Sequence, residues 1–275
     1  MNFQRTLNKS VSLAGKGLHK GQNVKVTFHS APAGNGITIR NNKEEYKLSL
    51  DLVFDTQRGT SIRYGKSEIY TVEHMLSALR GMGIDNAVIE LEGNEPPIFD
   101  GSALEYVKAL KKAGIKVLEK KRKQLLLKKT IVLKYNGKYI AAIPFAGYRI
   151  NFFTDFSGKG LLPEECFFEM KGNSFEKEIA PARTFGFKEE LDELIKNGLI
   201  KGADLRSAIL FDKAKPVNTK LRFKNEVTRH KVLDLLGDFG FLEGELNFIV
   251  IAVKTGHTQN IEMAKKIIQE AYYVA

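Results

Sequence analysis

The pattern of apolar residues changes its period in the same order twice along the 275-residue chain, and this repeat constrains the fold more than any other feature. Apolar and polar residues alternate at 24–28, as in a strand, and apolar residues then follow helical spacing at 72–82. The order recurs when strand-like segments at 125–156 precede a helical stripe at 232–239. Two runs of strands followed by helices predict an α+β fold of two similar domains, each with helices on one face of a sheet.

The remaining elements are predicted from the same periods and from turn residues. We expect further strands at 46–54, 60–64, 87–91, 125–133, 139–143, 150–156 and 248–253. We expect helices from an N-cap at Thr71, from 100–102 to about 113, at 189–197, after Thr228 and at 261–272. His257 lies between the last strand and the last helix, so we expect it in a loop.

Composition excludes several classes of protein. A single cysteine, Cys166, excludes an internal disulfide framework and any cysteine-based metal cage. No segment approaches the ~18 consecutive apolar residues of a membrane span. The first residues carry no apolar core of signal-peptide length, so we expect a cytoplasmic chain.

The net charge of +11 indicates anionic partners. Phosphate-bearing substrates, nucleic acid and anionic membrane surfaces all favour such charge. Part of it lies in the run Lys120-Lys121-Arg122-Lys123, which we interpret as a solvated linker that closes the first half. The charge also supports a rival hypothesis, a basic RNA-binding protein without catalytic activity. Against it, no RNA-binding signature occurs, and the aromatic residues follow core spacing.

A polar stripe lies on the helix expected after Thr228. His230, Asp234 and Asp238 recur every four residues, so their side chains share one face, separate from the apolar stripe. A histidine and a carboxylate at this spacing can hold one ion, and a further carboxylate can support the ligands. The alternative is an ordinary solvated face, because chance alone supplies about 0.6 such pairs in a chain of this composition.

Two other histidines occupy positions that a site can use. His74 stands beside Glu73 in the first turn of a helix, which offers a metal ligand next to a carboxylate that can accept a proton from water. The alternative is that Glu73 and His74 only interact with the positive end of the helix dipole and have no role in a site. His257 lies where loops carry catalytic groups, although many such histidines are simply exposed.

Six short motifs occur in order along almost the whole chain. They are Gly17-Leu18-His19, Thr71-Val72-Glu73-His74, residues 94–102 from Asn94 to Ser102, residues 182–187 from Ala182 to Phe187, residues 229–234 from Arg229 to Asp234, and Gly256-His257. Together they resemble the motifs of the UDP-3-O-acyl-N-acetylglucosamine deacetylases. The resemblance implies an enzyme that hydrolyses the N-acetyl group of UDP-3-O-acyl-N-acetylglucosamine, with release of acetate, in lipid A biosynthesis.

The resemblance also implies a zinc cofactor. His74, His230 and Asp234 would bind Zn²⁺, and two imidazoles with one carboxylate leave the open coordination that catalytic zinc requires. His19 and His29 would take no part in binding the metal.

The resemblance assigns four further residues to proton transfer and charge stabilisation. Glu73 would be the general base, and Thr184 would stabilise the oxyanion together with zinc. His257 would be the cationic acid that protonates the departing amine, with Asp238 as its orienting partner.

Such a substrate carries a diphosphate at one end and a fatty acyl chain at the other, and the expected contacts follow from these two groups. Lys231 would meet a phosphate, or else be an ordinary surface lysine. Phe185, Leu199 and Ile200 would contact the fatty acyl chain, or else belong to the core. Residues 201–207 and 220–222 depart from the family pattern in loops that concern substrate rather than zinc or proton transfer.

The fold that the resemblance implies has two domains packed helix to helix, with the active site between them. We expect a first domain at 1–120 with a small insert at about 40–66, and a second at 125–275 with a βαβ insert at about 186–212. We expect a monomer that binds the UDP-linked acylated glucosamine but no nucleic acid, with at most peripheral contact with the inner membrane. A zinc hydrolase of the same fold acting on another acylated sugar is the remaining alternative.

Overall fold

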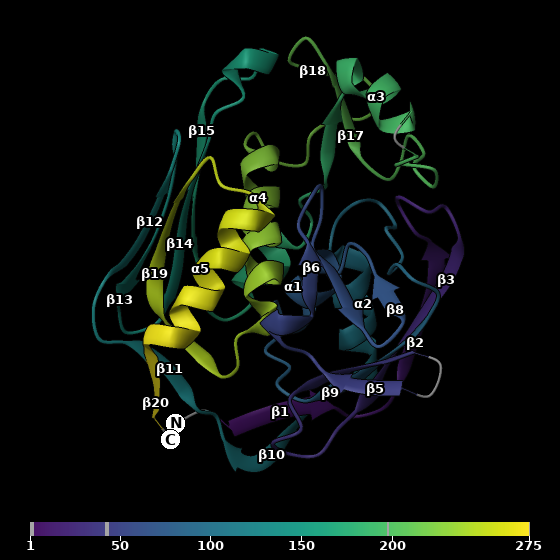
Figure 1. Ribbon diagram of the computed structural model, residues 1–275. Coiled ribbons are helices and arrows are strands. Elements are labelled where there is room, and N and C mark those ends of the chain that lie inside the picture. Colours follow the sequence, from purple (N-terminus) through teal and green to yellow (C-terminus); the bar gives the residue numbers. More distant parts are fainter. Residues whose placement is uncertain (1–2, 42–43, 197, 275) are drawn as a thin grey trace.

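Two sheets with the same strand order form the two halves of the protein (Figure 1), which a computed structural model describes over residues 3–41, 44–196 and 198–274. The first half has the order β2 (Val11–Lys16), β3 (Asn23–Ser30), β9 (Ala87–Glu92), β4 (Ile37–Asn41) and β5 (Glu44–Lys47). The second half has the order β12 (Ile131–Tyr135), β13 (Lys138–Pro144), β19 (Glu245–Val253), β14 (Tyr148–Thr154) and β15 (Glu164–Glu169). The central strands β9 and β19 each have an antiparallel neighbour on one side and a parallel neighbour on the other. The predicted α+β class is confirmed.

An antiparallel pair of strands joins the beginning of each half to its end. β1 (Phe3–Leu7) pairs with β10 (Ile115–Lys121), and β11 (Gln124–Leu127) pairs with β20 (Ala271–Val274). The repeat in the sequence is therefore a repeat of topology. The domain boundaries at 1–120 and 125–275 stay a prediction.

Two helices of each half lie between the sheets. α1 (Glu73–Gly81) and α2 (Leu104–Ala113) flank β9 in sequence, and α4 (Glu226–Asp238) and α5 (His257–Glu270) flank β19. Every second residue of β19, from Leu246 to Ala252, is buried, because one face of the sheet lies against helices.

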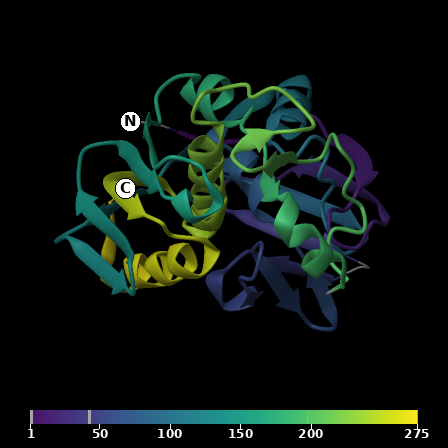
Figure 2. The same ribbon diagram turned by 90° about the horizontal axis from the view of Figure 1, so that it is seen from above.

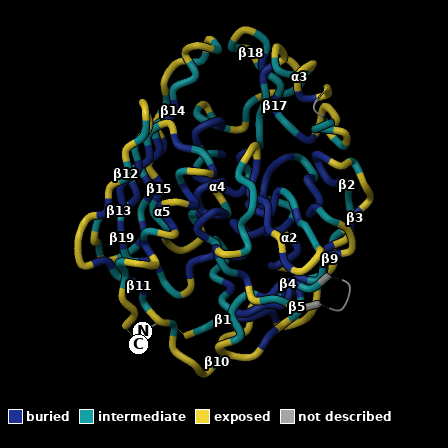
Figure 3. The backbone as a smooth tube through the Cα atoms, viewed as in Figure 1, coloured by how far each residue is buried: buried dark blue, intermediate teal, exposed yellow. Residues whose placement is uncertain are grey.

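α1 and α4 pack against each other at the centre of the molecule (Figures 1 and 2). Gly237 permits this approach, because a Cβ at this position would lie 2.1 Å from the backbone oxygen of Glu73. Most residues of α4 are buried (Figure 3), including His230, Asp234 and Asp238. The alternative of a solvated polar face on this helix is therefore wrong.

A small sheet is added to each half. In the first half, β6 (Val53–Asp55), β7 (Ser61–Tyr64) and β8 (Ser67–Ile69) form an antiparallel sheet. In the second half, β16 (Phe185–Phe187), α3 (Leu191–Lys196) and β17 (Ile209–Asp212) form a βαβ unit with parallel strands, which β18 (Lys215–Pro216) extends.

Within the described part of the chain, no helix has the length and apolar character that crossing a bilayer requires.

The starts of two helices differ from their predicted positions. Thr71 is not an N-cap: its φ is 55° and its hydroxyl donates to Glu95 at 2.9 Å, so α1 begins at Glu73. The last helix begins at His257, which the sequence places in a loop, because extended Gly256 acts as its N-cap.

Tertiary pairing overrides the local pattern elsewhere. Tyr272 lies in β20 rather than in the last helix, because β20 pairs with β11. The run at 120–123 is not a linker, since Lys120 and Lys121 belong to β10. Other boundaries also differ from the predicted ones. A 3-10 turn at Leu50–Leu52 divides the strand expected at 46–54, and residues 125–133 span parts of two strands. α4 begins before Thr228, and Asn197, the expected end of the helix at 189–197, lies outside the described residues.

Candidate active site

Three potential metal ligands meet where α1 crosses α4. His230 and Asp234 lie one helical turn apart on α4, and His74 reaches them from the first turn of α1. Asp234 Oδ1 lies 3.2 Å from His230 Nε2 and 3.8 Å from His74 Nε2. The two imidazole rings pack edge to face, with centroids 4.9 Å apart. All three side chains are buried, so these donor atoms are shielded from bulk water.

The hydrogen bond of His230 determines which nitrogen faces Asp234. Nδ1 lies 3.1 Å from the carbonyl oxygen of Ala182, which can only accept. In the neutral tautomer that this bond fixes, Nδ1 carries the proton and Nε2 presents a lone pair to the carboxylate. Lone pairs facing each other at this distance repel, so the arrangement favours a positive charge between them, either a proton or a metal ion.

The protonation states of the other two donors fit the same cation. Burial, together with the neighbouring His230, lowers the pKa of His74 to about 3, so the imidazole is neutral. Burial acts to raise the pKa of Asp234, but His230 and Lys231 outweigh it and hold this pKa well below its ordinary range. His74 Nδ1 and Asp234 Oδ1 are buried without a hydrogen-bond partner among the described residues. Two nitrogen donors and one carboxylate fit zinc.

Glu73 and His257 face the ligands from two other elements. The Glu73 carboxylate accepts the backbone N–H of Thr60 at 2.9 Å, and burial raises the pKa of this carboxyl to about 7. Burial acts to lower the pKa of His257, but the charge and hydrogen bond of Asp238 raise it to about 9. His257 Nδ1 lies 3.0 Å from Asp238 Oδ2. The Glu73 carboxyl, which titrates near pH 7, therefore lies beside the His257 imidazole, which stays protonated at that pH.

A second possible ligand set consists of Glu73, Asp234 and His257, whose donor atoms lie within 4.8 Å of one another. A protonated imidazole has no lone pair to give to a metal. The raised pKa of His257 therefore favours His74, His230 and Asp234 as the metal-binding set.

Lys231 and Phe185 lie at the edge of the cluster formed by His74, His230 and Asp234. The Lys231 ammonium donates to Asp234 Oδ2 at 2.7 Å and lies 5.6 Å from the centroid of the Phe185 ring. The Phe185 ring in turn lies 6.3 Å from that of His230. Thr184 precedes β16, where its N–H donates to Gly101, and no hydrogen bond within the described chain joins its hydroxyl to the cluster.

Leu199 and Ile200 follow α3 and belong to a loop whose backbone contacts residues 17–21. The N–H of Ile200 lies 3.5 Å from His19 Nδ1, and that of Gly202 donates to Leu18 O at 3.0 Å. This loop therefore packs against the loop at 17–21. The Phe185 ring, which the sequence analysis assigns to the acyl chain, instead packs with three aromatic rings that the sequence does not single out: Phe156, Phe187 and Phe211.

Sequence reasoning missed two residues that position Asp238. The Thr60 hydroxyl donates to Asp238 Oδ1 at 2.5 Å, and the Asn260 amide donates to Oδ2 at 2.8 Å. Thr60 and Asp238 are separated by 178 residues, so no spacing rule connects them. Asn260 lies three residues after His257 on α5, where helical spacing could have indicated it.

His19 and His29 lie outside both ligand sets of the described residues. The backbone N–H of His19 donates to the Glu95 carboxylate. The ring of His29, on β3, lies 3.0 Å from the Ser10 hydroxyl through Nδ1 and 2.7 Å from the Glu90 carboxylate through Nε2.

Comparison with known proteins gives the family that the motifs resemble, over nearly the whole chain. The family model for LpxC, UDP-3-O-acyl N-acetylglycosamine deacetylase, matches residues 4–269. The chain is 34% identical to the UDP-3-O-acyl-N-acetylglucosamine deacetylase of Syntrophus aciditrophicus over 98% of this chain and 87% of the relative. It is 37% identical to that of Legionella pneumophila strain Corby (96% and 89%) and 36% identical to that of Geotalea uraniireducens (98% and 90%). The chain therefore belongs to the UDP-3-O-acyl-N-acetylglucosamine deacetylase family.

Proposed function

We propose that the protein hydrolyses the N-acetyl group of UDP-3-O-acyl-N-acetylglucosamine and releases acetate, a step of lipid A biosynthesis. One observation carries the chemistry: a buried set of two imidazoles and a carboxylate lies beside a carboxyl group that titrates near pH 7 and a protonated imidazole. Amide hydrolysis needs ligands for an electrophilic ion, a base for water and an acid for the departing amine. Family membership supplies the substrate class.

His74, His230 and Asp234 would hold the ion, which we propose is zinc. Lys231 donates to Asp234 Oδ2, so Oδ1 is the carboxylate oxygen left for the ion. When bound, zinc polarises the substrate carbonyl and acidifies water at its open position. The Ala182 carbonyl keeps the His230 ring oriented by accepting a hydrogen bond from its Nδ1–H group.

Glu73 would accept the proton of the attacking water. A base acts best when its pKa lies near the working pH, and burial raises the pKa of Glu73 to about 7. The N–H of Thr60 fixes one carboxylate oxygen, which leaves the other to meet water.

His257 would stabilise developing negative charge and then donate its proton to the nitrogen of the departing amine. Asp238 holds this imidazole in its charged form and orients it, as the carboxylate does in a Ser-His-Asp triad. Thr60 and Asn260 keep Asp238 itself in place. The Thr184 hydroxyl would contribute a hydrogen bond to the oxyanion.

The substrate would be held at both of its ends. Lys231 would move toward a phosphate of the UDP group, and Phe185 would meet the acyl chain beside the aromatic rings that pack with it. Leu199 and Ile200 would contact the chain farther out, on the loop that packs against residues 17–21. We further propose a cytoplasmic monomer that binds no nucleic acid and touches the inner membrane at most peripherally.

The test is acetate release from UDP-3-O-acyl-N-acetylglucosamine by the zinc-loaded protein. Turnover should be lost in Glu73→Gln, which keeps the size of the side chain, and should persist in His29→Ala, whose histidine lies outside the ligand set. Release of acetate from a different acylated N-acetyl sugar, with none from the UDP-linked substrate, would instead favour the alternative hydrolase.

A further inference from the structure

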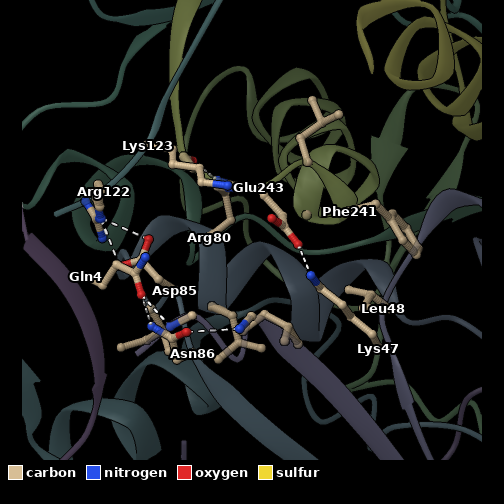
Figure 4. Close-up of a pocket in the computed structure, with 18 of the residues that line it drawn as sticks. Gln4, Lys47, Leu48, Arg80, Asp85, Asn86, Arg122, Lys123, Phe241 and Glu243 are labelled. Carbon is tan, nitrogen blue, oxygen red and sulfur yellow. Dashed lines mark hydrogen bonds and ion pairs between the residues drawn. The ribbon is translucent and has the colours of Figure 1, made fainter. Parts of the chain in front are cut away.

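The basic run at 120–123 takes no part in the proposed active site. Its members Lys120, Arg122 and Lys123 line a cavity of about 180 Å³ between the two halves (Figure 4). The cavity wall also includes Arg80 near the end of α1. Arg80 lies about 9 Å along the helix axis from His74, so this cavity is separate from the proposed metal ligands.

The wall of the cavity carries an excess of positive charge. Five cationic side chains line it against two carboxylates: Lys47, Arg80, Lys120, Arg122 and Lys123 against Asp85 and Glu243. Both carboxylates are already paired, Asp85 with Arg122 at 2.8 Å and Glu243 with Lys47 at 2.5 Å. Beyond these two ion pairs the wall carries three more cations, the partly buried Arg80 and the exposed Lys120 and Lys123.

Arg80 forms no ion pair with a carboxylate of the described residues. Its guanidinium donates to two backbone oxygens of the other half, Gly244 O at 2.8 Å and Phe239 O at 3.2 Å. Burial lowers the pKa of Arg80 below its ordinary value. A partly buried cation gains more from a counter-ion than an exposed one does, so an anion beside Arg80 would be favoured.

A second observation points in the same direction. An adjoining cavity of about 400 Å³ shares Arg80, Arg122 and Asp85 with the first and is also lined by Tyr148. Tyr148 is only 7% exposed, and its hydroxyl has no hydrogen-bond partner among the described residues. Buried hydroxyls are nearly always bonded. A phenolic O–H can donate to an oxyanion held near Arg80.

We propose that this paired cavity binds a phosphate oxyanion, either free or as the terminal group of a small molecule, through Arg80, Lys120 and Lys123. Guanidinium and ammonium groups are the side chains that recognise phosphate. The first cavity, which Lys120 and Lys123 line, is by itself smaller than the roughly 300–1,000 Å³ of pockets for drug-sized ligands, so this part of the paired cavity suits one oxyanion group. A purely structural clamp between the halves explains the bonds of Arg80 but gives no reason for Lys120 and Lys123 to line the same space.

The experiment titrates inorganic phosphate into the zinc-loaded protein by calorimetry at low ionic strength. The double variant Lys120→Gln/Lys123→Gln is compared with Lys128→Gln/Lys129→Gln, which removes the same charge from residues outside the cavity. We expect about 25-fold weaker binding in the first, because each ammonium about 4 Å from the anion contributes about fivefold in water. We expect less than about a twofold change in the second.

The proposed active site could also attract phosphate, so Lys231→Ala provides a third comparison. Affinity that persists in Lys231→Ala supports the cavity, whereas loss of all binding in that variant overturns the proposal. Equal affinities for the two double variants, or a wild-type protein that binds no phosphate, also overturn it. Displacement of radiolabelled phosphate by a phosphate monoester assigns the site to a terminal phosphate group, and its failure assigns the site to the free ion.

Discussion

Replacing Asp238 with asparagine should remove catalysis at alkaline pH while leaving the metal bound. Burial alone would lower the pKa of His257, but Asp238 at 3.0 Å raises it from 6.5 to about 9. This shift corresponds to roughly 3 kcal/mol in favour of the imidazolium. Asparagine keeps the size of the side chain and removes the charge, so the pKa of His257 should fall toward 6.5.

The expected size of the effect follows from the protonated fraction of His257. At pH 8 that fraction falls from about nine-tenths with a pKa near 9 to about one-thirtieth with a pKa near 6.5. kcat/KM at pH 8 should therefore fall about 30-fold, whereas at pH 6 it should fall less than about twofold. The acidic limb, which we assign to Glu73, should move much less than the alkaline limb, because Asp238 is one of the smaller causes that act on the pKa of Glu73.

The assay is the pH profile of kcat/KM for acetate release, with zinc content measured for each protein. Asp212→Asn is the matched control, because Asp212 is a surface acid paired with Lys188. An alkaline limb that stays at the same pH in Asp238→Asn, with zinc still bound, would refute the role of Asp238 in holding the charge of His257.

Four further predictions test other parts of the structure. His230→Ala and Asp234→Ala should each lose zinc and turnover, while His29→Ala keeps both; metal analysis after dialysis that finds full zinc in Asp234→Ala would remove it from the ligand set. Lys231→Ala should raise KM more at low salt than at high salt, and an effect independent of salt would contradict a phosphate contact. Shortening the acyl chain to acetyl should lower kcat/KM by orders of magnitude, since each buried methylene contributes ~0.8 kcal/mol, and equal efficiency would contradict a lipid-binding site. Gly237→Ala should destabilise the protein by about 1–3 kcal/mol, and an unchanged melting temperature would show that α1 and α4 relax apart without cost.

The sequence predicts best those features that depend on the local spacing of apolar residues. The apolar alternation at 24–28 and the stripe at 232–239 report burial directly, so the strands, the helices and their repeated order follow from it. The four-residue spacing of His230 and Asp234 likewise fixes their shared face on a helix.

Contacts between distant segments could not be predicted in this way. Thr60 shows only strand character in the sequence, yet it binds both Glu73 and Asp238. Tyr272 continues a helical pattern, but pairing with β11 places it in a strand. The basic run at 120–123 has the composition of a solvated linker, and only the packing of the two halves turns part of it into a cavity wall.

The crossing of α1 and α4 gives the proposed zinc a mechanical role. His74 belongs to the first half, whereas His230 and Asp234 belong to the second, so a shared ion would be a cross-link between them. Ligand binding free energy adds to the stability of the state that binds, and here that state is the docked one. Any opening that parts α1 from α4 would have to release the ion first. Loss of zinc to a chelator and exchange of the amide hydrogens along these two helices should therefore be limited by the same opening motion.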